Sequence, residues 1–304
     1  MKNKVIIGGA VALFVLALIV FFCFWLGNKI KDQIGKTDKT NANTTVQQTP
    51  QPSLPPATTE QAAQIFLALG NPTGATNSTS YPDNYLIVNT AYALSYNSSK
   101  ATPNWVAWRI AESDFGATNR QNNFRPDVNL PKGWTRATPA DYTGSGFDRG
   151  HLCPSADRSN SPEANGLTFL MTNIIPQTGD LNRNVWEELE TYSRNLVKKG
   201  KVDLYVVAGV YGEKGKLKNK ITVPTNCWKI IVAVPQGAGV SVINAETHVI
   251  AVDMPNATGI ASEDWRKFRT TVRSIEQKTG YNLLSNLPQN VQDVLENKVD
   301  DISN

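Results

Sequence analysis

The stretch GFDRGHLCPSADRSN, residues 146–160, holds one of only two histidines in a chain of 304 residues. His151 directly follows Asp148, Arg149 and Gly150. An imidazole can move a proton near neutral pH or bind a metal ion, and it can also be a buried structural group. We ask which of these roles the surrounding sequence favours.

The other cysteines and histidines exclude several kinds of site. Outside Cys23, which lies in an apolar N-terminal run, the chain has only His151, His248, Cys153 and Cys227. A closed zinc site needs four ligands at short paired spacings, and these residues do not form such pairs. The sequence also lacks HExxH, a Walker loop, GxGxxG and a GxSxG elbow. The spacing alone leaves open whether Cys153 and Cys227 form a disulfide.

A second candidate segment is LNRNVWEELETYSRNLVKKG, residues 181–200, which is predicted to be a helix. Asp180 is a plausible cap at its start, and Gly200 ends it after two lysines. At helical spacing, one face carries an apolar row: Val185, Leu189, Tyr192 and Leu196. Another face carries residues four apart: Asn182, Trp186, Glu190 and Arg194. Taken alone, the segment fits an ordinary amphipathic helix with a Glu190–Arg194 surface pair.

The remaining elements indicate an α+β domain. Further helices are predicted at residues 59–70 and 262–280. Runs rich in β-branched residues between Gly, Pro and Asn predict strands at residues 85–97, 104–110, 202–212 and 227–235, with one or two more in 240–255. Because the strands come mostly in neighbouring pairs, we expect a mixed or antiparallel sheet flanked by helices.

The N-terminal part differs in composition from the rest. Residues 5–27 carry no charged side chain and are long enough to cross a bilayer as one helix, so residues 1–36 are predicted to be an uncleaved membrane anchor with its flanks. A cleaved signal peptide is the alternative. Lysines on both sides of the span leave its orientation open. Residues 37–59 have the composition of a flexible linker, and residues 60–304 are predicted to form the folded domain.

The basic balance of the chain belongs to its N-terminal part. Residues 1–59 hold six of the 30 basic and two of the 26 acidic side chains, which leaves 24 of each in the domain. A polyanion would therefore have to bind a local basic cluster rather than a positive field over the whole domain.

Taken together, the two candidate segments resemble the DNA/RNA non-specific endonuclease family, the ββα-metal nucleases of the Serratia nuclease and endonuclease G type. The family's D-R-G-H is intact at residues 148–151, and its N-I-x-P-Q is intact at residues 173–177. Its helix pattern N-x3-W-x3-E-x3-R matches residues 182–194. The resemblance extends over roughly residues 68–298, and it implies a ββα-metal nuclease fold.

The resemblance also implies roles for individual residues. His151 is expected to be the general base that takes a proton from the attacking water. Asn182 is expected to be the single direct protein ligand of a Mg²⁺ ion, with Mn²⁺ or another divalent ion as an alternative. Glu190 is expected to hold the waters of that ion. Three arginines are expected to bind the phosphate: Arg120, Arg149 and Arg194. Arg125 could take the place of Arg120 if a loop differs in length.

Neighbouring residues are interpreted as structural. Asp148 is expected to fix the backbone or to orient His151, and Gly150 to permit a tight backbone. Cys153 and Trp186 are expected to pack in the core, although Trp186 could instead stack on a base. His248 is expected to be structural.

The implied activity is sequence-independent hydrolysis of DNA and RNA to 5′-phosphate products. Because such an enzyme would damage its host's chromosome, the domain is expected outside the cytoplasm, tethered to the membrane. Two alternatives stay open: an inactive nucleic-acid-binding module, and a phosphodiesterase of small phosphate esters. The sequence also leaves open whether the protein is a homodimer and whether a protein inhibitor binds it.

Overall fold

The computed structural model describes residues 58–301, and these residues belong to one compact unit. The predicted anchor at residues 1–36 and almost all of the predicted linker at residues 37–59 lie outside the described residues. Between residues 58 and 301, no helix is both long enough and apolar enough to cross a membrane.

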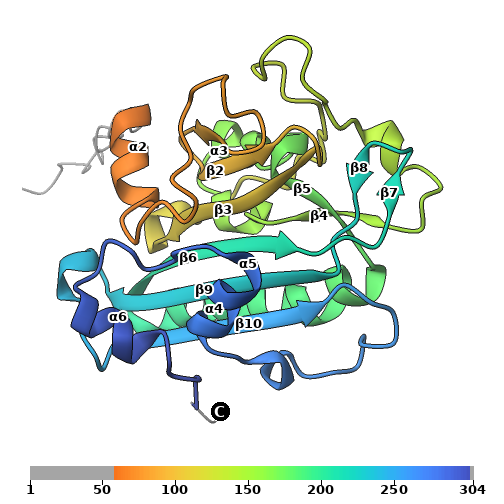
Figure 1. Ribbon diagram of the computed structural model, residues 1–304. Coiled ribbons are helices and arrows are strands. Elements are labelled where there is room, and N and C mark those ends of the chain that lie inside the picture. The colour runs from red at the N-terminus through yellow and green to blue at the C-terminus, as the bar shows by residue number, and fades with distance from the viewer. Residues whose placement is uncertain (1–57, 302–304) are drawn as a thin grey trace, which may run out of the picture. The chain divides into compact units, whose positions relative to one another are not determined.

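The centre of the domain is a six-stranded sheet in the order β1-β2-β3-β6-β9-β10 (Figure 1). Its strands are Tyr85–Val88 (β1), Ala93–Asn97 (β2), Thr102–Ile110 (β3), Val202–Tyr211 (β6), Asn226–Pro235 (β9) and His248–Pro255 (β10). Every pairing in this sheet is antiparallel. With the helices described next, this confirms the predicted α+β class.

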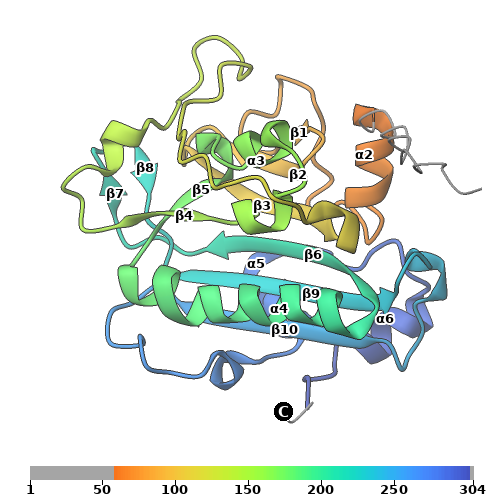
Figure 2. The ribbon, with the colours of Figure 1, turned by 180° about the vertical axis from the view of Figure 1, so that it is seen from behind.

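Helices cover both faces of the sheet (Figures 1 and 2). Trp186–Gly200 (α4) packs on one face, and Val272–Thr279 (α5) and Gln289–Leu295 (α6) lie on the other. The alternation of side chains along a strand separates the two cores. In β9, Cys227 and Ile231 belong to the core beneath α4, whereas Trp228 and Ile230 belong to the core beneath α5 and α6.

Two short helices and two hairpins lie outside these layers. Thr59–Phe66 (α2) begins at Thr58, whose hydroxyl accepts a hydrogen bond from the backbone N–H of Gln61. Pro162–Leu167 (α3) begins at Ser161, whose hydroxyl accepts from the N–H of Ala164. Two separate hairpins complete the fold: Asp148–His151 (β4) with Ile174–Gln177 (β5), and Lys216–Leu217 (β7) with Ile221–Thr222 (β8).

Local side chains explain where the elements differ from the predictions. Residues 85–97 form two strands rather than one, because the side chain of Asn89 accepts hydrogen bonds from the backbone of Ala91 and Tyr92 and so builds a turn. The predicted helix at residues 262–280 is interrupted. Thr271 caps the start of α5, and the preceding backbone pairs with β10 through the N–H of Thr270 and the carbonyl of Ala251. Residues 240–255 supply only one strand, β10.

Candidate active site

The D-R-G-H segment forms β4, which pairs with β5 from the N-I-x-P-Q segment. Gly150 faces Ile175 in this antiparallel pairing, and His151 faces Ile174. A Cβ atom on Gly150 would lie 1.9 Å from Oε1 of the buried Gln177. Only glycine fits this close approach, so the tight backbone expected at Gly150 is required by Gln177.

Asn173 fixes the chain immediately after His151. Its side-chain oxygen accepts a hydrogen bond from the N–H of Cys153 at 3.0 Å, and its amide nitrogen donates to the carbonyl of Cys153 at 2.8 Å. Cys153 is buried in the core, as expected for a packing residue, and burial raises the pKa of its thiol. Cys153 and Cys227 are both free thiols in this structure, which answers the question of a disulfide left open by their spacing.

The second candidate segment enters the site through a wide turn. Leu181–Val185 forms a π-helical turn that runs directly into α4. Such turns occur frequently at functional sites, and here the turn carries Asn182. The prediction that Asp180 caps this helix was wrong, because its carboxylate accepts instead from the N–H of Gly259 at 2.6 Å.

The two rows predicted on this helix are both directed towards the protein. Val185 and Leu189 of the apolar row are fully buried, and Tyr192 and Leu196 pack partly buried against the same core. In the other row, Trp186 is also buried, which favours its interpretation as a core residue over base stacking. This row therefore does not form a simple solvent-facing surface.

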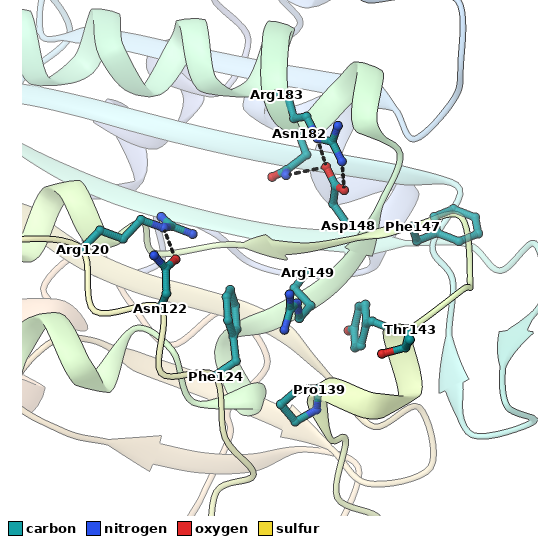
Figure 3. A pocket seen from close by; sticks show the side chains of 11 residues that line it. Arg120, Asn122, Phe124, Pro139, Thr143, Phe147, Asp148, Arg149, Asn182 and Arg183 are labelled. Atoms are coloured by element: carbon teal, nitrogen blue, oxygen red, sulfur yellow. Dashed lines mark hydrogen bonds and ion pairs between the residues drawn. The ribbon is translucent and has the colours of Figure 1, made fainter.

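Three of the expected site residues meet in one cavity of about 350 Å³ (Figure 3). Arg120 comes from the loop after β3, Arg149 from β4, and Asn182 from the π-helical turn. The complete lining consists of Arg120, Asn122, Phe124, Pro139, Tyr142, Thr143, Phe147, Asp148, Arg149, Asn182 and Arg183. The polar lining of this cavity is dominated by cationic and amide side chains.

His151 lies in the wall behind this cavity, between two phenylalanine rings. Its ring centroid is 5.3 Å from that of Phe124, which lines the cavity, and 5.0 Å from that of the buried Phe169. Arg149 stacks on the Phe124 ring at 4.4 Å, and Arg120 stacks on the Phe169 ring at 5.0 Å. The two aromatic rings thus hold the imidazole and both guanidiniums in one cluster.

This environment keeps the imidazole uncharged. Burial, followed by the positive charges of Arg120 and Arg149, lowers the pKa of His151 from 6.5 to about 3. Its Nε2 atom is buried and has no hydrogen-bond partner within residues 58–301. Of the two ring nitrogens, Nε2 is thus the one closed off from solvent.

Asp148 connects the β4 strand to the π-helical turn. Its Oδ2 accepts a hydrogen bond from Nδ2 of Asn182 at 3.0 Å, and both of its oxygens bind the guanidinium of Arg183 (Figure 3). Burial alone would raise the pKa of Asp148, but the bonds from Arg183 and Asn182 lower it below its usual range. With its nitrogen bound to Asp148, the Asn182 amide turns its oxygen away from the carboxylate.

Glu190 and Arg194 do not line this cavity. Oε1 of Glu190 lies 3.3 Å from Nζ of Lys229, a side chain of β9 that is only 2% exposed. The Lys229 ammonium also lies 4.1 Å from the centroid of a ring of Trp186. Glu190 is nonetheless close enough for its charge to act on Arg120, which is part of the cavity.

Arg194 is held among acidic side chains. Its Nη1 lies 3.3 Å from Oδ1 of Asp157 and 4.0 Å from Oε2 of Glu190. Asp157 also accepts a hydrogen bond from the indole N–H of the buried Trp108 at 3.0 Å. The structure therefore places Arg194 in an ion-pair network next to Glu190 and not at the surface of the cavity.

The structure distinguishes Arg120 from its alternative. Nη1 of Arg120 donates to Oγ of Ser155 at 2.9 Å, and its Nε donates to Asn122 at 2.8 Å, so the guanidinium faces the cavity. Arg125 instead donates to the carbonyl of Gly166 at 2.8 Å and does not line the cavity.

Sequence reasoning missed Lys229 and Arg183. Lys229 had a visible signal, because it is the only charged residue in the strand CWKIIVAVP and therefore needs a buried partner. Arg183 gave no comparable signal. His248, the first residue of β10, has the structural role expected for it. Its Nε2 lies 3.0 Å from Oδ1 of Asp300.

Comparison with known proteins shows the family of this chain. The sequence profile of the DNA/RNA non-specific endonuclease family matches residues 69–290. A nuclease of Nostoc sp. is 52% identical over 253 residues, which cover 82% of this chain and 92% of the relative. A nuclease of Serratia marcescens is 34% identical over 241 residues, or 76% of this chain and 84% of the relative.

The fold is also similar to that of a solved structure. A chain from the crystal structure of the EndoG/EndoGI complex superposes with a TM-score of 0.61 at 24% identity, covering 75% of this chain and 92% of that chain. The profile match and the two relatives show that this chain belongs to the DNA/RNA non-specific endonuclease family and is a nuclease.

Proposed function

We propose that the protein is a Mg²⁺-dependent endonuclease that cleaves phosphodiester bonds of DNA and RNA without sequence preference and leaves 5′-phosphate ends. The observation that carries this proposal is the meeting of Arg120, Arg149 and Asn182 in one cavity, with His151 in its wall. A cation pair, an amide ligand and an uncharged base are the groups that phosphodiester hydrolysis needs.

His151 acts as the general base through Nδ1. Because Nε2 is buried, Nδ1 is the nitrogen that takes the proton from the water attacking phosphorus. The low pKa of the ring ensures that it is unprotonated before the substrate binds. The negative charge of a bound phosphate offsets the charges of Arg120 and Arg149, so it raises the pKa of His151 towards the working pH when the proton has to be accepted.

Asn182 is the residue that fits a divalent ion. Its nitrogen is bound to Asp148, which leaves the amide oxygen as an available hard ligand on the cavity side. Mg²⁺ usually keeps several waters and takes few protein ligands, so a single amide oxygen beside a phosphate suits it. When bound, the ion polarises the phosphate and stabilises charge on the leaving 3′ oxygen.

The charged side chains around Asn182 have different proposed roles. Arg149 and Arg120 bind the phosphate oxygens and stabilise the negative charge that develops during attack. Glu190 lies behind the cavity and acts on Arg120 through its charge, and Arg194 lies 4.0 Å from Glu190. Contacts of these kinds are made to the backbone of the nucleic acid and read no bases, which accounts for the lack of sequence preference.

End-group analysis combined with a small-substrate comparison tests this proposal. We expect full-length protein to produce fragments that a ligase can join directly, because 5′-phosphate and 3′-hydroxyl ends are ligatable. Cleavage of polymers should fall steeply with added salt, whereas hydrolysis of bis(p-nitrophenyl) phosphate should be slow and nearly independent of salt. Efficient hydrolysis of the small ester with little polymer cleavage would support the phosphodiesterase alternative, and salt-sensitive binding without cleavage would support the binding module.

We also propose that the nuclease domain is held outside the cytoplasm by the N-terminal segment. The proposal is supported by the uncharged run at residues 5–27 and by the danger that an active nuclease poses to the chromosome. Protease added to intact cells should remove the nuclease domain. Protection of the domain until the membrane is broken would contradict this orientation.

A further inference from the structure

A second cationic feature lies beside the cavity, in the hairpin formed by β7 and β8. The sequence EKGKLKNK, residues 213–220, places a lysine at every second position from Lys214 to Lys220, with Glu213 as its only acidic residue. The domain as a whole holds 24 basic and 24 acidic side chains, so a polyanion would need a local cluster such as this run. None of the groups proposed for catalysis belongs to it.

The fold presents this hairpin as a rigid support. Lys218 and Asn219 are the central residues of the turn between β7 and β8, with φ values of 50° and 55°, and the N–H of Lys220 closes this turn onto the carbonyl of Leu217. Asn suits this conformation, but a lysine is uncommon there. On either side of the turn, Leu217 and Ile221 are buried, which fixes the hairpin to the protein.

Two of the four lysines already have partners. Nζ of Lys220 lies 2.7 Å from Oδ2 of Asp141, and Lys214 donates to the carbonyl of Asn256. Lys216 and Lys218 are exposed, and neither has an acidic partner among residues 58–301. Their two charges are therefore available to a ligand.

The hairpin and the catalytic cavity share one wall. Leu217 and Ile221 pack in the same small core as Tyr142, against which Phe147 also packs. Tyr142 and Phe147 both line the cavity, and Nζ of Lys214 lies 5.5 Å from the centre of the Phe147 ring. Figures 1 and 2 both show β7 and β8 at the end of the molecule where the chain leads into β4.

We propose that the β7–β8 hairpin is a binding site for the sugar-phosphate backbone of the substrate, next to the phosphate that is cleaved. The proposal rests on the proposed function. Lysines on flexible stems act as point charges, so Lys216 and Lys218 can follow the backbone of either a single strand or a duplex without reading bases. The hairpin thereby extends the row of phosphate contacts that begins at Arg149.

The salt dependence of binding tests this site quantitatively. The variant Lys216→Gln/Lys218→Asn removes two charges, keeps the buried Leu217, and places Asn where the backbone has a positive φ. The control Lys199→Gln/Lys201→Asn makes the same change at the end of α4, where both lysines are exposed and Lys201 has a φ of 52°. Lys216→Arg/Lys218→Arg keeps the charge.

Binding of a fluorescent single-stranded oligonucleotide is measured by anisotropy with full-length protein in EDTA, over a range of salt concentrations. Loss of two phosphate contacts should reduce the slope of log K against log salt by about 1.4 and weaken binding roughly tenfold at 0.15 M salt. The control and the arginine variant should retain the wild-type slope. A wild-type slope in the Lys216→Gln/Lys218→Asn protein would overturn the proposal.

These measurements contain no metal and involve no cleavage, so their outcome does not depend on the proposed catalysis. Plasmid cleavage by the wild type tests the catalysis in parallel. A membrane surface is the other polyanion that the hairpin could meet. Vesicles of phosphatidylglycerol are therefore tested with the same proteins. If the hairpin variant loses vesicle binding but binds the oligonucleotide as the wild type does, the nucleic-acid site is refuted in favour of a lipid contact.

Discussion

The carboxylate of Asp148 accepts a hydrogen bond from the side-chain nitrogen of Asn182 at 3.0 Å, across 34 positions of sequence. This bond joins the strand that carries His151 to the turn that carries the proposed metal ligand. It also determines which end of the Asn182 amide faces the cavity. Asp148 therefore positions Asn182, a role different from orienting His151.

Replacing Asp148 should weaken binding of the metal. In Asp148→Ala the Asn182 amide is free to rotate, so we expect the metal concentration for half-maximal activity to rise about tenfold to a hundredfold, as for other residues that orient a ligand. Asp180→Ala is the matched control, since Asp180 lies just before the same turn but bonds to Gly259. Superimposable metal activation curves for Asp148→Ala and wild type would contradict this role.

Removal of Lys229 should destabilise the fold through Glu190. Both side chains are largely buried, and Lys229→Met would remove the nearer cation of the Glu190 carboxylate and leave only Arg194, 4.0 Å away. We expect the free energy of unfolding in urea to fall by about 3–5 kcal/mol, the usual cost of breaking a buried pair. The double variant Lys229→Met/Glu190→Gln should recover a large part of that loss. Equal losses in the single and double variants would show that the pair itself is not responsible.

Gly150→Ala should disturb the β4–β5 hairpin through one contact. The added methyl would meet Oε1 of Gln177 at 1.9 Å, and we expect a loss of about 1–3 kcal/mol in stability together with reduced activity. Gly179→Ala, where the nearest atom is 3.7 Å away, should be tolerated. The second-site change Gln177→Ala should restore activity to Gly150→Ala. If Gln177→Ala does not restore activity, contact with Gln177 is not the reason that position 150 requires glycine.

The imidazole of His151 should stay uncharged well below neutral pH. Its pKa of about 3 predicts no protonation between pH 5 and 8 in an NMR titration, where the His248→Gln variant assigns the two histidine signals. Because the ring titrates near 6.5 in the unfolded chain, folding releases a proton and the free energy of unfolding should decrease as the pH falls below 6.5.

The same titration tests why the pKa is low. Arg149→Gln should raise the pKa of His151, since it removes one of the two cations that lower it. Arg125→Gln, whose guanidinium is bonded to Gly166, should leave the pKa unchanged. A His151 signal that titrates near 6.5 in the wild-type protein would show that the ring is neither buried nor close to these charges.

The sequence predicted well those features that depend on local patterns. The strands at 202–212 and 227–235 and the apolar row of the 181–200 helix follow from periodicity, and β6, β9 and α4 confirm them. Predictions failed where one side chain controls the backbone. Asn89 makes a turn inside a strand-like run, and Thr271 starts a helix within a longer helical pattern.

The site could be predicted only as a set of residues and not as an arrangement. Arg120, Arg149 and Asn182 converge because three separate elements meet at one cavity, which no spacing reveals. The π-helical turn changes the phase of the helix just before α4. Spacing of four residues therefore could not show that Asn182 reaches the cavity and that Glu190 lies in a buried network. The partner of Lys229 likewise depends on how α4 packs on β9.

The proposed mechanism is tested most simply by incubating full-length protein with supercoiled plasmid and with single-stranded RNA, in Mg²⁺ or in EDTA. His151→Ala and Asn182→Ala are assayed alongside the wild type. We expect both substrates to be degraded only with the metal, and His151→Ala to be at least about a hundredfold slower, a loss typical of a general base. Salt-sensitive binding without cleavage by the wild type, or full activity of His151→Ala, would contradict the proposed mechanism.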